Sequence, residues 1–281
     1  ICLKFKTRSD TEIIRGFFNF LLELIQGVPQ GILIFLPSYA LLEEYKEFIN
    51  RDPVLASKIG REKKIFFEKN FKSFHPQFES YKIACKARGG IFFVVFAGKF
   101  SEGVDFKDEL ARLVIILGIP FSNIHDFKIQ AKKAYLVEQF SKSPKSFNSK
   151  DNQLNHLQFQ DWYNYEAMLQ VNQAVGRVKR NDNDFGLAIL IDSRFHDPRF
   201  NCLLSRHVRE LNTSFNTFEE MKSYSFDFYK TNMIKPEEII EKVIEKPTQS
   251  ILDHFNGIKK IDKQSSHHID VDEDKETKEF H

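Results

Sequence analysis

Short, uninterrupted apolar runs recur along the chain and predict buried β-strands. Unbroken runs, rather than alternating apolar and polar positions, are typical of parallel strands covered on both faces of a sheet. The predicted strands are residues 32–36, 91–96, 113–117 and 187–191. Segments with helical spacing lie between them, and this alternation predicts a doubly wound α/β domain with a mainly parallel sheet.

The predicted helices lie before, between and after these strands. The first covers residues 13–25, with Ser9 or Asp10 as its N-cap. That segment is too short, and with Arg15 and Glu23 too charged, to span a bilayer, so we expect no membrane contact. The other predicted helices are residues 39–49, 71–87, 127–140, 163–180, 203–211, 217–230 and 236–246.

Two polar segments interrupt or follow this pattern. Residues 141–160 are rich in Ser, Lys, Asn and Gln and are interpreted as a surface insertion between two helices. Residues 247–281 are polar and charged, and we expect a disordered tail there. The predicted organisation is therefore one domain over residues 1–246, with C-terminal helices, followed by the tail at 247–281.

The composition indicates a folded globular protein but does not point to a particular function. The 281 residues are 42% hydrophobic and 28% charged, which is typical of a folded globular chain. The net charge is only +2, so any surface that binds nucleic acid must be local. Cys2, Cys85 and Cys202 lie far apart in sequence. They form neither a disulfide framework nor a four-cysteine metal site, and we expect a reducing compartment and no metal ligands.

The strongest candidate for chemistry is the stretch at residues 171–180. Gln173, Arg177 and Arg180 stand at i, i+4 and i+7, so a helix would place them on one face. Two guanidinium groups beside an amide suit a polyphosphate ligand. Gly176 lowers helix propensity and permits close approach to the backbone. A solvated basic helix face is the alternative interpretation of this stretch.

A second candidate, residues 98–106, directly follows a predicted strand. Its glycines permit positive φ angles, and its backbone N–H groups could bind an anion. Glu102 and Asp105 are acceptors for a ribose hydroxyl, an arginine or a water, and Lys99 is a cation for phosphate. An ordinary strand-to-loop turn remains the alternative. The spacing is not that of a phosphate-binding P-loop, and no such sequence occurs in the chain.

The third candidate is residues 35–39, where the first predicted strand ends. Pro37 ends the strand, and Ser38 is well suited to cap the next helix. Serine hydroxyls and helix N-termini also bind phosphates readily. Capping alone is the alternative interpretation.

Together, the three stretches resemble the second motor domain of superfamily 2 DNA helicases of the XPD-like, iron–sulfur type. Residues 35–39 resemble motif IV of that family, residues 98–106 motif V, and residues 173–180 motif VI. The resemblance runs from about Gly31 to Phe200. Further matching stretches are residues 111–121, 161–163, 184–186 and 192–195, and residues 118–123 and 162–163 lean toward the Fanconi-anaemia J and telomere-elongation regulator types.

The resemblance implies a RecA-like fold and a set of roles. In the family, ATP and Mg²⁺ bind in a cleft between two RecA-like domains. On this basis Arg180 is the arginine finger, Arg177 supports it, and Gln173 contacts the nucleotide or its attacking water. Nucleotide binding and coupling fall to Gly98, Glu102, Gly103, Asp105 and Gly176. Contacts to single-stranded DNA fall to Ser38, Tyr39, Lys99 and Ser101.

The resemblance also implies partners and a location. It predicts unwinding of a DNA fork in the 5′ to 3′ direction, in the nucleus, as part of DNA repair. Three positions depart from the family pattern: Ala97 replaces an arginine, Lys179 replaces a branched apolar residue, and Asn181 replaces a common histidine. None of these removes a residue assigned to catalysis.

Several parts of the family's machinery have no counterpart in these residues. The phosphate-binding loop, the acidic Mg²⁺ motif and the four-cysteine site for a 4Fe–4S cluster belong to the first motor domain in the family. We therefore expect this chain alone not to hydrolyse ATP and to work with its own upstream motor domain.

Two other functions stay open. One is a non-catalytic RecA-like module that binds nucleic acid. The other is an interaction through the tail, where residues 249–255 loosely match a sliding-clamp peptide. Gln249, Leu252 and Phe255 would be the anchors, although Asn256 replaces the second aromatic residue of that pattern.

Overall fold

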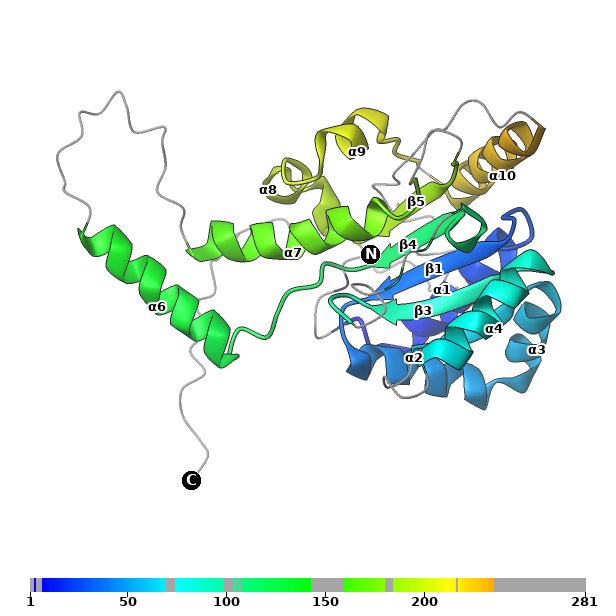
Figure 1. The fold of residues 1–281 in the computed structure, drawn as a ribbon, viewed down its shortest axis with the longest axis horizontal. Coiled ribbons are helices and arrows are strands. Elements are labelled where there is room, and N and C mark those ends of the chain that lie inside the picture. The colour runs from blue at the N-terminus through cyan, green and yellow to red at the C-terminus, as the bar shows by residue number, and fades with distance from the viewer. Residues whose placement is uncertain are drawn as a thin grey trace, which may run out of the picture.

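Five parallel strands form one sheet in the computed structural model, in the order β2-β3-β1-β4-β5 (Figure 1). The structure describes residues 3, 7–68, 74–98, 104, 106, 108–142, 159–179, 184–215 and 217–234. The strands are β1 (Gly31–Leu36), β2 (Lys64–Phe67), β3 (Gly90–Val95), β4 (Leu113–Leu117) and β5 (Leu187–Ile191). The four predicted strands and the doubly wound parallel sheet are confirmed, and β2 is an additional edge strand.

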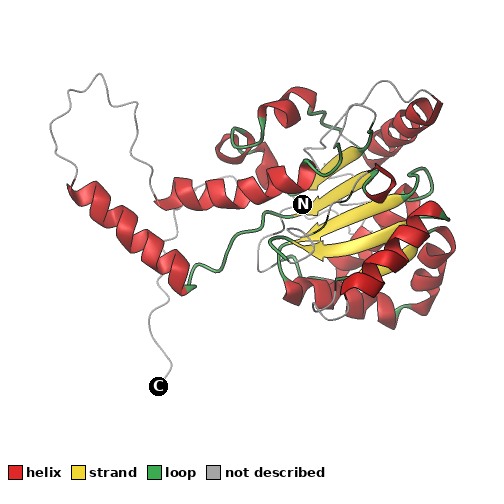
Figure 2. Cartoon of the chain, viewed as in Figure 1, coloured by secondary structure: helices red, strands yellow, loops and turns green. Residues whose placement is uncertain are grey.

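Helices cover both faces of the sheet (Figure 2). The first layer consists of α1 (Thr11–Leu24), α2 (Tyr39–Arg51), α3 (Pro53–Glu62) and α10 (Phe218–Ile234). The second consists of α4 (Phe74–Lys86), α7 (Phe159–Val175), α8 (Pro198–Asn201) and α9 (Arg206–Leu211). Along β1, Ile32 and Ile34 pack in the first layer's core and Leu33 and Phe35 in the second's. This double burial explains why the strands are unbroken apolar runs.

Side-chain caps set the helix boundaries. Asp10, and not Ser9, caps α1 by accepting a hydrogen bond from the Glu12 amide at 2.8 Å. Asp52 caps α3, and Pro53 stands at its first position. This acid–proline signal could have revealed α3, which the hydrophobic pattern alone did not predict. Ser205 caps α9, so that helix starts later than the predicted residue 203.

The predicted helix over residues 163–180 is wrong at both ends. α7 starts at Phe159 and ends at Val175. From there the backbone tightens, since the Arg177 amide donates to the Ala174 carbonyl and the Val178 amide to the Val175 carbonyl. Gly176, a poor helix former, stands at this transition. Arg177 therefore lies beyond the end of α7 and not on the helical face that carries Gln173. Arg180 lies outside the described residues.

Other predictions fall wholly or partly outside the described residues. They include the helix at 236–246, the tail at 247–281 with Gln249, Leu252 and Phe255, and residues 143–158 of the polar insertion. α6 (Phe127–Lys142) ends at residue 142 and α7 begins at residue 159, so the polar insertion connects two helices, as predicted. No helix in the described part of the chain is long and apolar enough to cross a membrane.

α6 and α7 form a hairpin in which α6 lies away from the sheet, whereas residues 167–175 of α7 pack on it (Figure 1). Lysines of α6 lie over aromatic rings of α7: Lys132 Nζ is 5.7 Å from the Trp162 ring and Lys133 Nζ is 5.5 Å from the Phe159 ring. Such cation–π contacts contribute about 0.5–1 kcal/mol each at exposed sites. Trp162, the only tryptophan of the chain, therefore lies at the junction of the two helices.

Lys63 is a buried cation at the amino edge of the sheet. Only 3% of the residue is exposed, and its Nζ donates to the Gln30 carbonyl at 2.9 Å. Burial lowers the pKa of Lys63 from 10.5 to about 8, partly offset by the nearby Cys85 and Glu62. Burial also raises the pKa of the Cys85 thiol from 9.0 to about 11.

We expect the chain to become more stable between pH 7 and pH 9. The folded Lys63 loses its proton near pH 8 while the unfolded one keeps it, so the unfolded state binds more protons and stability rises with pH. Above pH 9 Cys85 acts in the opposite sense, because only the unfolded thiol then ionises. The net gain from pH 7 to pH 9 is about 1 kcal/mol.

Urea titrations followed by circular dichroism at pH 7, 8 and 9 measure this gain. Lys63→Met should flatten the pH profile, whereas Lys64→Met, at the exposed neighbouring position, should leave it unchanged. A stability that falls over this range, or an equal rise in Lys63→Met, would contradict the assignment.

Candidate functional site

Two of the three predicted motifs, IV and V, begin at the carboxyl edge of the sheet. β1 and β4 are neighbours, and the connections that follow them run to opposite sides of the sheet. In open α/β sheets, ligands bind outside the carboxyl ends of the strands at such a switch point. Ser38 follows β1, Gly98 follows β3, and Gly118 follows β4. The edge is therefore where a ligand of this fold is expected.

Arg177 joins the motif VI stretch to the motif V stretch. Its Nη1 donates to the Val104 carbonyl at 2.6 Å, and its guanidinium carbon lies 5.9 Å from the centre of the Phe106 ring. Phe106 is fully buried and packs edge-on against Phe78 of α4. The two motifs, 73 residues apart in sequence, thus meet at one side chain.

Replacing Arg177 should destabilise the domain measurably. A hydrogen bond from a charged donor contributes about 1.5–3 kcal/mol, so Arg177→Ala is expected to lower the free energy of unfolding by that order. Gln173→Ala, at an exposed position on the last turn of α7, is the matched control and should change it little. Equal stabilities of the two variants in urea titrations would show that Arg177 does not tie the motifs together.

Glu68 is a buried carboxylate that the sequence pattern did not single out. It follows β2 and is 4% exposed. Oε1 accepts from the Tyr39 hydroxyl at 2.8 Å, and Oε2 accepts from the Val95 amide at 2.8 Å. A Cβ atom at Gly98 would lie 2.8 Å from Glu68 Oε1, so the glycine makes room for this carboxylate. Glu68 therefore links the motif IV helix to the start of motif V.

The other predicted residues differ in how they are placed. Ser38 Oγ accepts from the Leu41 amide at 3.3 Å and caps α2, as its capping interpretation requires. Tyr39 keeps 49% of its surface exposed although its hydroxyl is bound to Glu68. Gln173 and Gly176 are exposed. Predicted site residues outside the described part of the chain are Lys99, Ser101, Glu102, Gly103, Asp105 and Arg180.

Within the described residues, neither the pockets nor clusters of metal-binding side chains indicate a second site. Two open pockets of about 470 Å³ each lie away from the motifs, one beside α1 and α2 and one beside β2 and α4. Among the described residues, no group of three or more His, Cys, Asp or Glu side chains could hold a metal ion. The candidate site therefore comprises the starts of motifs IV and V at the carboxyl edge and the end of α7, which Arg177 joins to motif V.

The fold and these contacts define a RecA-like domain of the kind found in helicases. Residues 21–211 match the family described as the helicase C-terminal domain, and the chain belongs to this family. The matched range contains all three motifs, and the predicted resemblance to XPD-like superfamily 2 helicases is confirmed.

Curated relatives are named as helicases and are several times longer than this chain. The ATP-dependent DNA helicase CHL1 of Candida albicans is 33% identical over 211 residues, which are 73% of this chain and 24% of that protein. The regulator of telomere elongation helicase 1 homolog of Drosophila persimilis is 37% identical over 207 residues, covering 73% of this chain and 19% of its own length. The chain thus spans about a fifth to a quarter of these relatives.

Solved structures with a similar arrangement include two XPD helicases. The structures described as XPD_APO and XPD_Helicase are each 20% identical to this chain, with TM-scores of 0.48 and 0.49. They cover 72% of this chain, which corresponds to 36% and 32% of their own chains.

Proposed function

We propose that this chain is the second motor domain of an ATP-dependent 5′–3′ DNA helicase that acts in DNA repair in the nucleus. The contact that supports this best is the bond from Arg177 to the Val104 carbonyl, because it places motif VI against motif V. Membership of the helicase C-terminal domain family, and relatives named as helicases, support the same conclusion.

In this proposal the end of α7 faces the nucleotide. ATP with Mg²⁺, held mainly by a first motor domain, supplies the phosphoanhydride bond that is cleaved. Arg180 acts as the arginine finger, which stabilises charge on the transferred phosphoryl group. Gln173 contacts the nucleotide or its attacking water. Arg177 is a positioning residue, since its guanidinium is bound to Val104 and lies beside Phe106.

The motif V residues would link nucleotide state to the DNA track. Glu102, Gly103 and Asp105, with Gly98 and Gly176, are assigned this coupling role. Ser38, Tyr39, Lys99 and Ser101 are assigned to the single-stranded DNA backbone. Such phosphate contacts are independent of sequence and weaken with added salt. Tyr39 supports this assignment, because half of its surface is exposed beside the capped start of α2.

The first test is the size of the native polypeptide, by immunoblot with an antibody against residues 247–281. A band well above 33.0 kDa, from a protein with ATPase activity stimulated by single-stranded DNA, is the expected result. A 4Fe–4S cluster is expected in that longer protein and not in these residues. A band at 33 kDa would favour the alternative, a non-catalytic RecA-like module that binds nucleic acid.

The purified 281-residue chain provides the complementary assay. It should turn over no ATP, since the P-loop and the acidic Mg²⁺ motif are absent from its sequence. ATPase activity of the chain alone that disappears in Arg180→Ala would contradict the division of roles between two domains.

A further inference from the structure

Leu3 lies at the carboxyl edge of the sheet, close to Gly118, which directly follows β4. Its amide donates to Asp192 Oδ2 at 3.2 Å, and its carbonyl accepts from Arg194 Nη2 at 3.3 Å. Leu3 is only 5% exposed. One acid and one arginine, 189 and 191 positions away in sequence, thus bind both backbone groups of a single residue. Both hydrogen bonds are made to backbone atoms, so they do not depend on which side chain this residue carries.

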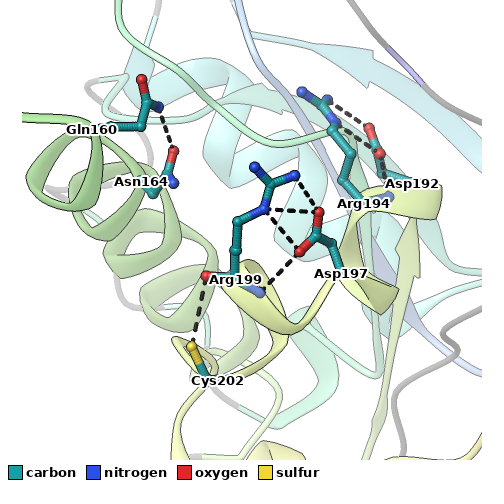
Figure 3. Close-up of polar contacts among 7 residues, drawn as sticks. All are labelled: Gln160, Asn164, Asp192, Arg194, Asp197, Arg199 and Cys202. Carbon is teal, nitrogen blue, oxygen red and sulfur yellow. Dashed lines mark hydrogen bonds and ion pairs between the residues drawn. The ribbon is translucent and has the colours of Figure 1, made fainter. Parts of the chain in front are cut away.

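The Asp192–Arg194 pair is held rigidly in place. Asp192 is fully buried and accepts from the Arg194 amide at 2.9 Å, from its Nε at 2.9 Å and from its Nη2 at 2.7 Å (Figure 3). The guanidinium carbon lies 5.6 Å from the centre of the Phe121 ring. Phe121 stacks on Tyr163 of α7 at 5.2 Å. A paired and stacked guanidinium loses little entropy when it binds a further acceptor.

The side chain of Leu3 lies close to the residues that follow β4 and β1. Gly118, directly after β4, has φ +81, a conformation that other residues rarely adopt. A Cβ atom at Gly118 would lie 3.4 Å from Leu3 Cβ and 3.6 Å from Pro37 Cγ. Leu3 thus occupies part of the edge where open α/β sheets bind their ligands, next to Pro37 of motif IV.

A second ion pair nearby shows which features are specific to the Asp192–Arg194 pair. Asp197 and Arg199 have the same spacing, the same amide cap and the same forked hydrogen bonds (Figure 3). Their side chains, however, are 28% and 76% exposed, against 0% and 21% for Asp192 and Arg194. The local hydrogen-bond pattern is therefore shared by both pairs. The Asp192–Arg194 pair differs because it is more buried and because it binds the backbone of Leu3.

We propose that the Asp192–Arg194 pair is a docking site for the backbone of the N-terminal segment. It fixes where that segment meets the sheet, beside Pro37 of motif IV. The inference rests on the proposed function, in which the first motor domain precedes this segment. Docking then sets the position from which the two motor domains close on the nucleotide. Asp192 and Arg194 are positioning residues in this scheme.

Amide hydrogen exchange at Leu3 tests the docking in the 281-residue chain. With ¹⁵N-leucine labelling, Asp192→Asn should speed exchange of the Leu3 amide by at least about tenfold, since one of the two accepting oxygens becomes an NH2 donor and the charge of the acceptor is removed. Asp197→Asn is the matched control and should leave this rate unchanged. Arg194→Lys, which keeps the charge but loses the fork, provides a second variant if Asp192→Asn does not fold. Unchanged exchange at Leu3 in the folded variants would overturn the docking site.

A protein that contains both motor domains tests the positioning role. Leu3→Pro removes the amide donor, whereas Leu3→Ala keeps it, and both lose the leucine side chain. We expect kcat for ATP hydrolysis to fall about tenfold in Leu3→Pro relative to Leu3→Ala, because misplaced domains close less often. Equal kcat values would overturn the positioning role. A wild-type protein without ATPase activity would instead count against the proposed function, since exchange at Leu3 reports docking independently.

Discussion

Arg180→Ala is expected to reduce kcat for DNA-stimulated ATP hydrolysis by roughly 10³- to 10⁵-fold in a protein that contains both motor domains. The physical reason is that an arginine finger stabilises charge that develops only in the transition state. Binding of single-stranded DNA should change little, because the residues assigned to the DNA track lie in other motifs. Steady-state ATPase and DNA-binding titrations on the same preparation measure both effects.

Lys179→Ala is the matched control for this prediction. Lys179 is the neighbouring cation and stands where the family usually has an apolar residue, so we expect a loss of less than about tenfold. A comparable loss of kcat in both variants would show that the total positive charge of the segment matters, and not Arg180 in particular. Full activity of Arg180→Ala would remove Arg180 from the catalytic machinery.

Asp184→Ala is expected to be the most destabilising single substitution at the amino edge of the sheet. Asp184 is 1% exposed and accepts from Arg112 Nη1 at 2.5 Å. Arg112 Nε also donates to Gln30 Oε1 at 2.8 Å, and its guanidinium carbon lies 4.1 Å from the Phe185 ring centre. Removing one partner of a buried pair leaves an uncompensated charge, which costs about 3–5 kcal/mol.

Urea unfolding at constant pH measures this loss. Asp197→Ala, which removes an aspartate from an exposed pair, is the control and should shift the midpoint only slightly. The double variant Asp184→Leu with Arg112→Met removes both charges and should be more stable than Asp184→Ala. If Asp184→Ala were as stable as the Asp197→Ala control, the buried pair would not hold the start of β4 to the start of β5.

The sequence predicts the sheet well because its strands are buried on both faces. An unbroken apolar run such as residues 113–117 leaves few alternatives to a central parallel strand. β2 escapes the same pattern because it is a four-residue edge strand that starts with the exposed Lys64. Periodicity also failed at the end of α7, where Gly176 and a tight turn replace the predicted helix.

The candidate site is only partly visible in the sequence, because its contacts are made by tertiary structure. The motifs predict which residue types gather, but not that the Arg177 guanidinium binds a backbone carbonyl of motif V. Glu68 has no pattern around it other than a short apolar run, and its partners come from two other elements. Backbone docking such as that of Leu3 leaves no side-chain signature at the docked residue at all.

The position of Trp162 determines what an optical experiment on this protein reports. As the only tryptophan, it lies on α7 beside Lys132 of α6, and neither core cluster of the sheet includes it. Its emission therefore follows separation of the hairpin helices, while circular dichroism follows the whole domain. Coincident urea transitions would show that the hairpin and the sheet melt as one cooperative unit. An earlier fluorescence transition would make Trp162 a built-in reporter for any ligand that clamps α6 onto α7.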